Sequence, residues 1–98
     1  MLLRIIKSYR DVVAICDKKL LGKRFEEGKF QLDLTGEFFK GKEVSQEEAI
    51  EIIQDMSIED STFNIIGEKS TTTAIKAGII SEEGIKKIQG IPFALVLM

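Results

Sequence analysis

The pattern of apolar positions predicts strands near both ends of the chain. The runs "LLRIIK" at 2–7 and "DVVAIC" at 11–16 are rich in aliphatic residues and are separated by three residues, which is the spacing of a β-hairpin. The last run, "PFALVLM" at 92–98, is apolar throughout. Because such a strand has no polar face to turn to solvent, we expect it in the interior of a sheet that is covered on both sides.

The next part of the chain predicts one short helix and one strand. Asp17 suits a helix N-cap and precedes "KKLLGK" at 18–23, a helical turn that ends near its glycine. "FEEG" at 25–28 has the composition of a turn. In "KFQLDL" at 29–34 apolar and polar residues alternate, which predicts a strand that is buried on one side. Its expected buried residues are Phe30, Leu32 and Leu34.

The clearest helix is predicted at 46–56. Ser45 and Glu48 form a capping box at the start of "QEEAIEIIQDM". The apolar residues of this segment recur at spacings of three and four, and acidic residues lie on the other side. One face is therefore expected on the core. The acidic face is either a solvated surface or a docking edge for a basic partner.

The second half continues with a strand and two helices. "STFNIIG" at 61–67 is expected to be a buried strand, and "EKSTTTAIKA" at 68–77 follows as a helix that Gly78 ends. Ser81 precedes "EEGIKKI" at 82–88, which has the signals of a last short helix.

These elements predict an α+β fold in which residues 1–98 form a single two-layer domain. The sheet is expected to be mixed. It would contain the N-terminal hairpin, the strand at 29–34 and a central C-terminal strand at 92–98. The helices at 46–56 and 68–77 would pack on it.

The composition excludes several kinds of functional site. The 98 residues include no histidine and one cysteine. Histidine-based triads, internal disulfides and cysteine-rich metal sites are therefore impossible. We assign no catalytic residue, no metal ion and no cofactor. Cys16 lies in an apolar run, which is typical of a buried structural thiol and not of a nucleophile.

The chain lacks the sequence features of a membrane protein. The longest uncharged apolar run, at 91–98, has eight residues, which is too short to span a bilayer. The first residues, "MLLRIIK", carry two basic residues within the apolar run and no small-residue cleavage site, so we interpret them as a strand and not as a signal peptide. No contact with a membrane is expected.

The first third of the chain is basic and suggests contact with RNA. Residues 1–30 carry eight Lys or Arg and four acidic residues, whereas residues 31–62 carry two and nine. Phe25 lies among the basic residues, and a basic patch with an aromatic side chain can hold RNA phosphates and one stacked base. The alternative is an ordinary solvated surface, with Phe25 in the core. The candidate contacts to the RNA backbone are Lys18, Lys19, Lys23, Arg24 and Lys29.

The stretch "GEKST" resembles a phosphate-binding loop but does not meet its pattern. Such a loop needs a glycine directly before the lysine, and here Glu68 precedes Lys69. A strand–glycine–helix junction still exposes free backbone N–H groups, which favour anions. Gly67, Lys69 and Ser70 are therefore candidates for an anion or phosphate contact. In the alternative interpretation Gly67 only permits a turn and Glu68 complements the helix dipole.

Two adjacent aromatic residues suggest a third kind of contact. Phe38 and Phe39 lie in a loop that contains glycines at 36 and 41. Adjacent side chains in an extended segment point in opposite directions. Either both pack against the core by different routes, or one of them is exposed and contacts a partner.

Several stretches together resemble the archaeal family known as domain of unknown function number 424. They are "ICDKKLLGKRFEEGKFQLDL", "FFKG", "NIIGEKS" with "AIKAGII" behind it, and the closing "IQGIPFA". The resemblance covers nearly the whole chain. It implies a small archaeal protein of the cytoplasm with no assigned activity. Histidine is frequent in the family after the closing proline, where this chain has Phe93.

Two functions from different classes follow. The first is a non-enzymatic binding module that contacts RNA or a ribonucleoprotein, based on the basic first third. The second is a protein–protein interaction module or homodimer, based on the adjacent aromatic residues and the acidic helix. An enzyme ranks third: Glu68 and Lys69 could in principle act as acid and base, but adjacent residues on a helix point about 100° apart, which disfavours a shared reacting atom.

Overall fold

The computed structural model describes all 98 residues. The elements are β1 (Leu2–Ile6), β2 (Asp11–Cys16), η1 (Lys18–Leu20), β3 (Arg24–Glu27), β4 (Phe30–Asp33), β5 (Lys42–Glu43), α1 (Gln46–Ser57), β6 (Ser61–Ile66), α2 (Glu68–Ala77), η2 (Glu82–Gly84), β7 (Lys86–Ile88) and β8 (Ile91–Leu97).

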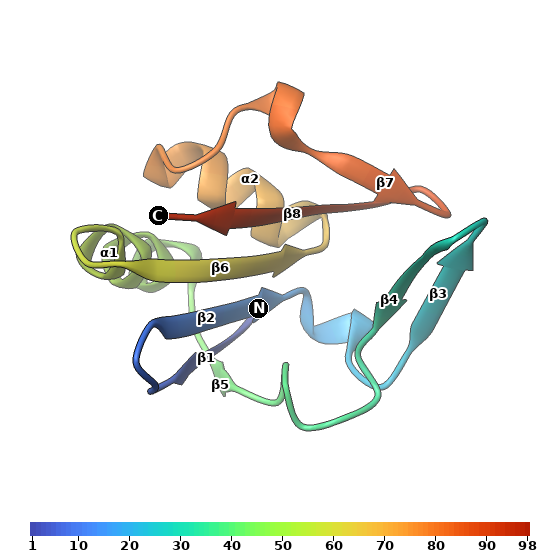
Figure 1. Cartoon of the computed structure of the whole chain (residues 1–98), viewed down its shortest axis with the longest axis horizontal. Helices are drawn as coiled ribbons and strands as arrows, with labels where there is room; N and C mark the ends of the chain where they lie inside the picture. Colours follow the sequence, from blue (N-terminus) through green and yellow to red (C-terminus); the bar gives the residue numbers. More distant parts are fainter.

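The predicted α+β class is confirmed. Six strands form a mixed sheet in the order β5-β1-β2-β6-β8-β7, in which only β2 and β6 run parallel. Both helices pack on one face of this sheet (Figure 1). Strands β3 and β4 form a separate two-stranded hairpin, which projects from the end of the sheet where β2 and β6 finish.

The main core lies between the helices and the sheet. The two helices contribute small and aliphatic side chains that pack on the central strands β2 and β6, where Val13, Ile15, Phe63 and Ile65 are fully buried. The central members of this core are Val13, Ile15, Ala49, Ile53, Phe63, Ile65, Ala74 and Ala77. Burial of these apolar side chains is the dominant favourable contribution to folding.

A second core lies on the opposite face of the sheet, near the ends of β2 and β6. It joins the main sheet to η1, the β3–β4 hairpin and the loop before β5. Its members are Leu2, Ala14, Cys16, Leu20, Leu32, Leu34, Phe39, Ile66 and Ile88. This cluster explains why the hairpin holds its place although it shares no ladder hydrogen bonds with the main sheet.

The capping box of α1 is confirmed in part. The Ser45 hydroxyl accepts a hydrogen bond from the Glu48 amide at 3.1 Å, as an N-cap residue does. The Glu48 carboxylate pairs instead with Lys42 at 3.1 Å. Gly78 ends α2 in the left-handed conformation, with φ of 86°, as predicted.

The prediction for residues 25–34 was wrong in two respects. The segment at 25–28, expected as a turn, belongs mostly to β3. The strand predicted at 29–34 is β4, and it pairs with β3 and not with the main sheet. Alternation shows that a strand has one buried side, but it does not identify the neighbouring strand.

Two further expectations near the C-terminus need correction. The predicted helix at 82–88 is one 3₁₀ turn, η2, followed by the strand β7. Strand β8 is interior, between β6 and β7, as predicted, but it is not covered on both sides. Leu95 is 62% exposed and Leu97 is 71% exposed, because the second core does not extend to that end of the sheet.

Candidate functional site

The site begins where the two parallel strands end side by side. Cys16 and Ile66 are the last paired residues of β2 and β6, so Asp17 and Gly67 follow at the same end of the sheet. The Asp17 amide donates to the Ile66 carbonyl oxygen at 3.0 Å. The Gly67 amide donates to the carbonyl oxygen of Pro92, on β8, at 2.8 Å. Three strands therefore hold this corner in position.

Asp17 caps helix α2 and not the helical turn that follows it in sequence. Its Oδ2 atom accepts from the Lys69 amide at 3.1 Å, and its Oδ1 atom accepts from the Ser70 amide at 2.9 Å and the Ser70 hydroxyl at 2.8 Å. The sequence had suggested that Asp17 caps the helical turn at η1, but Asp17 makes no side-chain hydrogen bond to that turn. The carboxylate is 3% exposed, so it lies buried at the positive end of the helix dipole.

Gly67 is required by the position of that carboxylate. Its φ is +116°, which disfavours any residue with a side chain. A Cβ atom there would lie 2.3 Å from Cγ of Asp17. The glycine predicted to permit a turn therefore has a second role, because it makes room for the Asp17 carboxylate beneath the first turn of α2.

This geometry changes the anion hypothesis for Gly67, Lys69 and Ser70. The two amides that an external anion would need already donate to Asp17, and Gly67 and Ser70 are buried. An internal carboxylate thus stands where a phosphate would bind. What stays available to a ligand is the exposed side chain of Lys69.

The hydroxyl-rich start of α2 is accounted for by internal hydrogen bonds. The Thr71 hydroxyl donates to the Gly67 carbonyl oxygen at 2.8 Å, and the Thr73 hydroxyl donates to the Lys69 carbonyl oxygen at 2.7 Å. Gln46, on α1, donates to the Thr73 hydroxyl at 3.3 Å. The buried threonines, poor helix formers by propensity, are therefore packing residues and not ligand contacts.

A cationic hollow of about 570 Å³ opens beside this corner. Lys18 and Lys19 reach it from η1, and Lys69 reaches it from the first turn of α2. Lys18 pairs with Glu43, on β5, at 3.1 Å. Lys19 and Lys69 take part in no ion pair, so their charges are available to an anionic ligand. The other lining residues are Met1, Asp17 and Glu43.

The remaining basic residues of the RNA hypothesis lie elsewhere. Lys23 precedes the β3–β4 hairpin, Arg24 begins β3, and Lys29 lies in its turn. The Arg24 guanidinium pairs with Glu26 at 2.9 Å and donates to the Gln31 side chain at 2.9 Å. These contacts offset the charge of Arg24 within the hairpin. The fold therefore splits the predicted basic patch between the hollow and the hairpin.

The aromatic residues also divide between buried and exposed positions. Phe25, the expected stacking residue, is half-buried against the second core. Phe30, expected on the buried side of its strand, is 63% exposed near the hairpin turn. The alternation placed Phe30 on the correct side of the strand. At this position, however, the hairpin projects beyond the rest of the protein, so the ring stays exposed. The adjacent Lys29 was the only signal that could have drawn attention to it.

Phe38 and Phe39 separate as their adjacency suggested. Phe39 is 6% exposed in the second core, whereas Phe38 is 41% exposed. Their ring centroids are 5.0 Å apart with an angle of 72° between the planes, an edge-to-face contact. Phe38 thus has a structural contact as well as an exposed edge, and its role toward a partner remains a hypothesis.

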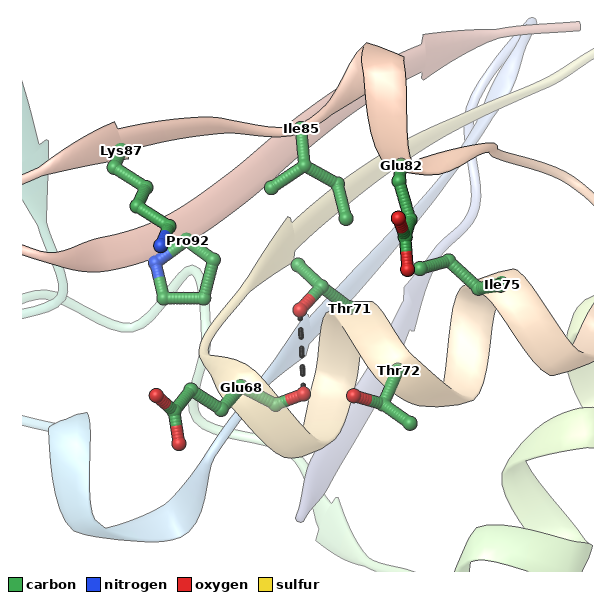
Figure 2. Close-up of a pocket in the computed structure, with 8 residues that line it drawn as sticks. All are labelled: Glu68, Thr71, Thr72, Ile75, Glu82, Ile85, Lys87 and Pro92. Atoms are coloured by element: carbon green, nitrogen blue, oxygen red, sulfur yellow. Dashed lines mark hydrogen bonds between the residues drawn. The ribbon is translucent and has the colours of Figure 1, made fainter.

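A second hollow, of about 470 Å³, lies between α2 and the segment that leads into β7 (Figure 2). Figure 2 shows the carboxylates of Glu68 and Glu82 at opposite ends of it, with Thr71 and Ile85 between them. The groups of a catalytic site must converge on one point, and the polar groups of this hollow do not. No group of three or more histidine, cysteine or acidic residues in the structure could hold a metal ion.

Cys16 is fully buried in the second core. Burial, with the neighbouring Asp17 carboxylate as a smaller cause, raises the pKa of its thiol to about 11. A nucleophilic cysteine needs the opposite shift. Neither α1 nor α2 has the length and apolar character that crossing a membrane would require.

Comparison with known proteins identifies the family. The structure is similar to the crystal structure of an uncharacterized conserved protein from Methanopyrus kandleri, with a TM-score of 0.89 and 24% sequence identity over 98% of this chain and 89% of that one. At this identity the likeness shows a shared fold. No curated protein matches the chain. The model of one protein family matches residues 6–98, and the chain therefore belongs to the family described as Protein of unknown function (DUF424).

Proposed function

We propose that this protein is a non-enzymatic module that binds RNA, alone or within a ribonucleoprotein, and that the cationic hollow contacts the RNA backbone. The observation that carries the proposal is the meeting of Lys18, Lys19 and Lys69 around one hollow, although Lys69 is far from the other two in sequence. Two of these lysines have no carboxylate partner. Unpaired lysines that line a concave surface attract phosphate groups from solution.

The neighbouring hairpin supplies a second type of contact. Phe30 presents an exposed ring near the hairpin turn, and Lys29 lies beside it. Stacking of a base on an exposed aromatic ring contributes roughly 1–3 kcal/mol and tolerates any base. Single-stranded RNA suits this arrangement, because its bases are free to stack while its phosphates contact lysines.

Net charge limits the affinity that this mode of binding can reach. The whole chain carries a formal charge of −2, so its long-range field does not attract RNA. Binding must depend on the local group of lysines. With two or three phosphate contacts, the logarithm of affinity should fall with the logarithm of salt concentration at a slope of about −1.4 to −2.1.

The test is binding of a labelled single-stranded RNA of mixed sequence, measured by fluorescence anisotropy at several salt concentrations. Reversing both free lysines, Lys19→Glu with Lys69→Glu, should abolish binding at low salt. The matched control reverses two exposed lysines away from the hollow, Lys76→Glu with Lys86→Glu, and should retain most of the affinity. Phe30→Ala should weaken binding about tenfold or more without changing the salt slope.

Two results would contradict the proposal. The first is an absence of binding to any RNA at low salt. The second is equal loss of affinity in the hollow variant and the charge-matched control, because that outcome would mean that only the overall charge matters.

A cytoplasmic location in an archaeal cell belongs to the same proposal. It is supported by the family resemblance and by a single, buried cysteine, which is typical of proteins that fold without disulfides. The alternative function is a protein–protein interaction module or homodimer, supported by the exposed edge of Phe38. Recovery of one protein partner from cell extract, unaffected by ribonuclease, would favour that alternative.

A further inference from the structure

One part of the sheet is left without any cover. On the face opposite the helices, the second core covers only the end near Asp17. Beyond it, cross-strand register aligns side chains of β1, β2, β6 and β8 in two rows on the same face. We call this surface the open face. Its residues are Ile6, Val12, Thr62 and Leu97 in one row, and Asn64 and Leu95 in the other.

The open face has four apolar side chains and, on β6 between them, the two uncharged polar side chains of Thr62 and Asn64. The side chains of Leu95 and Leu97 are more than half exposed, and those of Ile6 and Val12 are partly exposed. Exposed apolar side chains on adjacent strands mark an interaction surface more often than isolated ones do. None of the strand residues in the two rows is acidic.

Cations border the open face on three sides. Arg4 lies in the same row as Leu95, at the β1 edge, and its guanidinium donates only to the Glu37 carbonyl oxygen. Lys86 extends from β7 on the same face, opposite Phe93 in the register. Arg10 donates to the main-chain oxygen of Met98, the last residue of the chain, at 2.8 Å, at the end where β8 finishes. None of the three cations forms an ion pair with a carboxylate side chain.

The size of the surface favours a helix over a second copy of the chain. Four neighbouring strands span about 14 Å between their axes, which is close to three turns of an α-helix. The two rows contribute six residues, far fewer than the roughly 20–30 that each partner contributes to a stable protein–protein interface. Two open faces placed together would also bring cationic borders near one another, which costs free energy.

We propose that the open face docks a short amphipathic helix from another protein, with leucine-like side chains on its apolar stripe and acidic residues along its flanks. The apolar stripe would cover Leu95 and Leu97, and the acidic flanks would pair with Arg4, Arg10 and Lys86. This site is separate from the cationic hollow, so one protein can hold RNA and a partner helix together.

The test uses synthetic helical peptides of about three turns as probes. One peptide has a leucine stripe with glutamate flanks, a second has lysine flanks, and a third has the glutamate flanks with serine in place of leucine. Binding to the full chain is followed by amide chemical shifts in NMR spectra. The expected result is that only the first peptide binds well, with the largest shifts at Ile6, Val12, Asn64, Leu95 and Leu97.

Variants of the protein separate the two parts of the proposal. Each of Leu95→Ser and Leu97→Ser should weaken the first peptide about tenfold, because each removes one buried leucine contact. Arg4→Glu with Lys86→Glu should reverse the preference toward the lysine-flanked peptide. The control Ile58→Ser changes an apolar residue that is 84% exposed away from the open face and should leave binding unchanged. Melting curves of all variants should match the wild type within a few degrees.

Three outcomes would overturn the proposal. One is no binding of the acidic peptide at about 1 mM, where even weak contacts register. Another is equal binding of peptides with acidic and basic flanks. The third is a concentration-dependent dimer in sedimentation experiments that Leu95→Ser and Leu97→Ser abolish, because a second copy would then be the occupant.

Discussion

Removal of the Asp17 carboxylate should destabilise the protein more than any other change to a single acidic residue. Asp17→Ala removes the cap of α2, which contributes about 1–2 kcal/mol in comparable helices. It also leaves the buried amide and hydroxyl of Ser70 without their acceptor, at a cost of roughly 1–3 kcal/mol. The expected loss is about 3 kcal/mol of the free energy of unfolding, a large part of the roughly 5–15 kcal/mol that such a domain has.

The assay is urea unfolding followed by circular dichroism, supported by thermal melting. For a domain of this size, a loss of about 3 kcal/mol lowers the melting temperature by roughly 12–24 °C. Asp60→Ala is the matched control, since Asp60 is exposed and makes no side-chain hydrogen bond. That variant should stay within about 0.5 kcal/mol of the wild type.

A second substitution tests whether Gly67 exists to make room for Asp17. Gly67→Ala should cost about 4 kcal/mol in the wild type, because backbone strain at φ of +116° adds to the clash with the carboxylate. In the Asp17→Ala background the clash disappears, and the same change should cost about 2 kcal/mol. The two substitutions should therefore be non-additive by about 2 kcal/mol.

Two outcomes would refute this reasoning. If Asp17→Ala cost less than about 1 kcal/mol, the three hydrogen bonds would not be the main support of α2. If Gly67→Ala had the same cost with and without Asp17, the close approach of the two residues would have no energetic weight.

Two other predictions concern side chains with shifted pKa values. The Cys16 thiol, with its pKa raised to about 11, should react slowly with a thiol reagent at neutral pH in the native protein and rapidly after denaturation, and fast native labelling would contradict its burial. Hydrogen bonds from the Thr35 hydroxyl and the Thr35 amide, the latter at 2.9 Å, lower the pKa of Asp33, so the stability that they contribute is present above the ordinary carboxyl pKa of 3.8 and is lost as pH falls through the lowered value. An NMR titration should show the pKa of Asp33 moving back toward 3.8 in Thr35→Ala, and an unchanged pKa would assign the shift to other groups.

Much of the secondary structure could be predicted because its causes are local. The N-terminal hairpin, both long helices and the interior position of β8 follow from apolar periodicity, from the cap at Ser45 and from the stop at Gly78. The same local logic failed at 82–88, where one 3₁₀ turn replaces a helix. There the pairing of β7 with β8 at the sheet edge stabilises the chain more than a longer helix would. This preference depends on the neighbouring strand and not on the local sequence.

The candidate site depended on tertiary structure to a greater degree. The sequence made all three lysines candidates, Lys18 and Lys19 for RNA contact and Lys69 for anion contact. It did not predict that they line one hollow. The parallel pairing of β2 with β6 brings them together, because it places the ends of two distant segments side by side. The exposure of Phe30 could not be predicted from the sequence, because it depends on whether other segments of the chain reach far enough to cover this residue.

The sequence by itself determined the N-terminal hairpin, the two long helices α1 and α2, the absence of histidine-based and internal disulfide chemistry, and the burial of Cys16. These properties depend on residue types and on spacing along the chain. Only the tertiary structure decided that Asp17 caps a helix that begins some fifty residues later, that Gly67 must lack a side chain for that reason, and that one half of a sheet face stays open. Each of these depends on which distant segments become neighbours, and that choice is made by the packing of the whole chain and not by any local pattern.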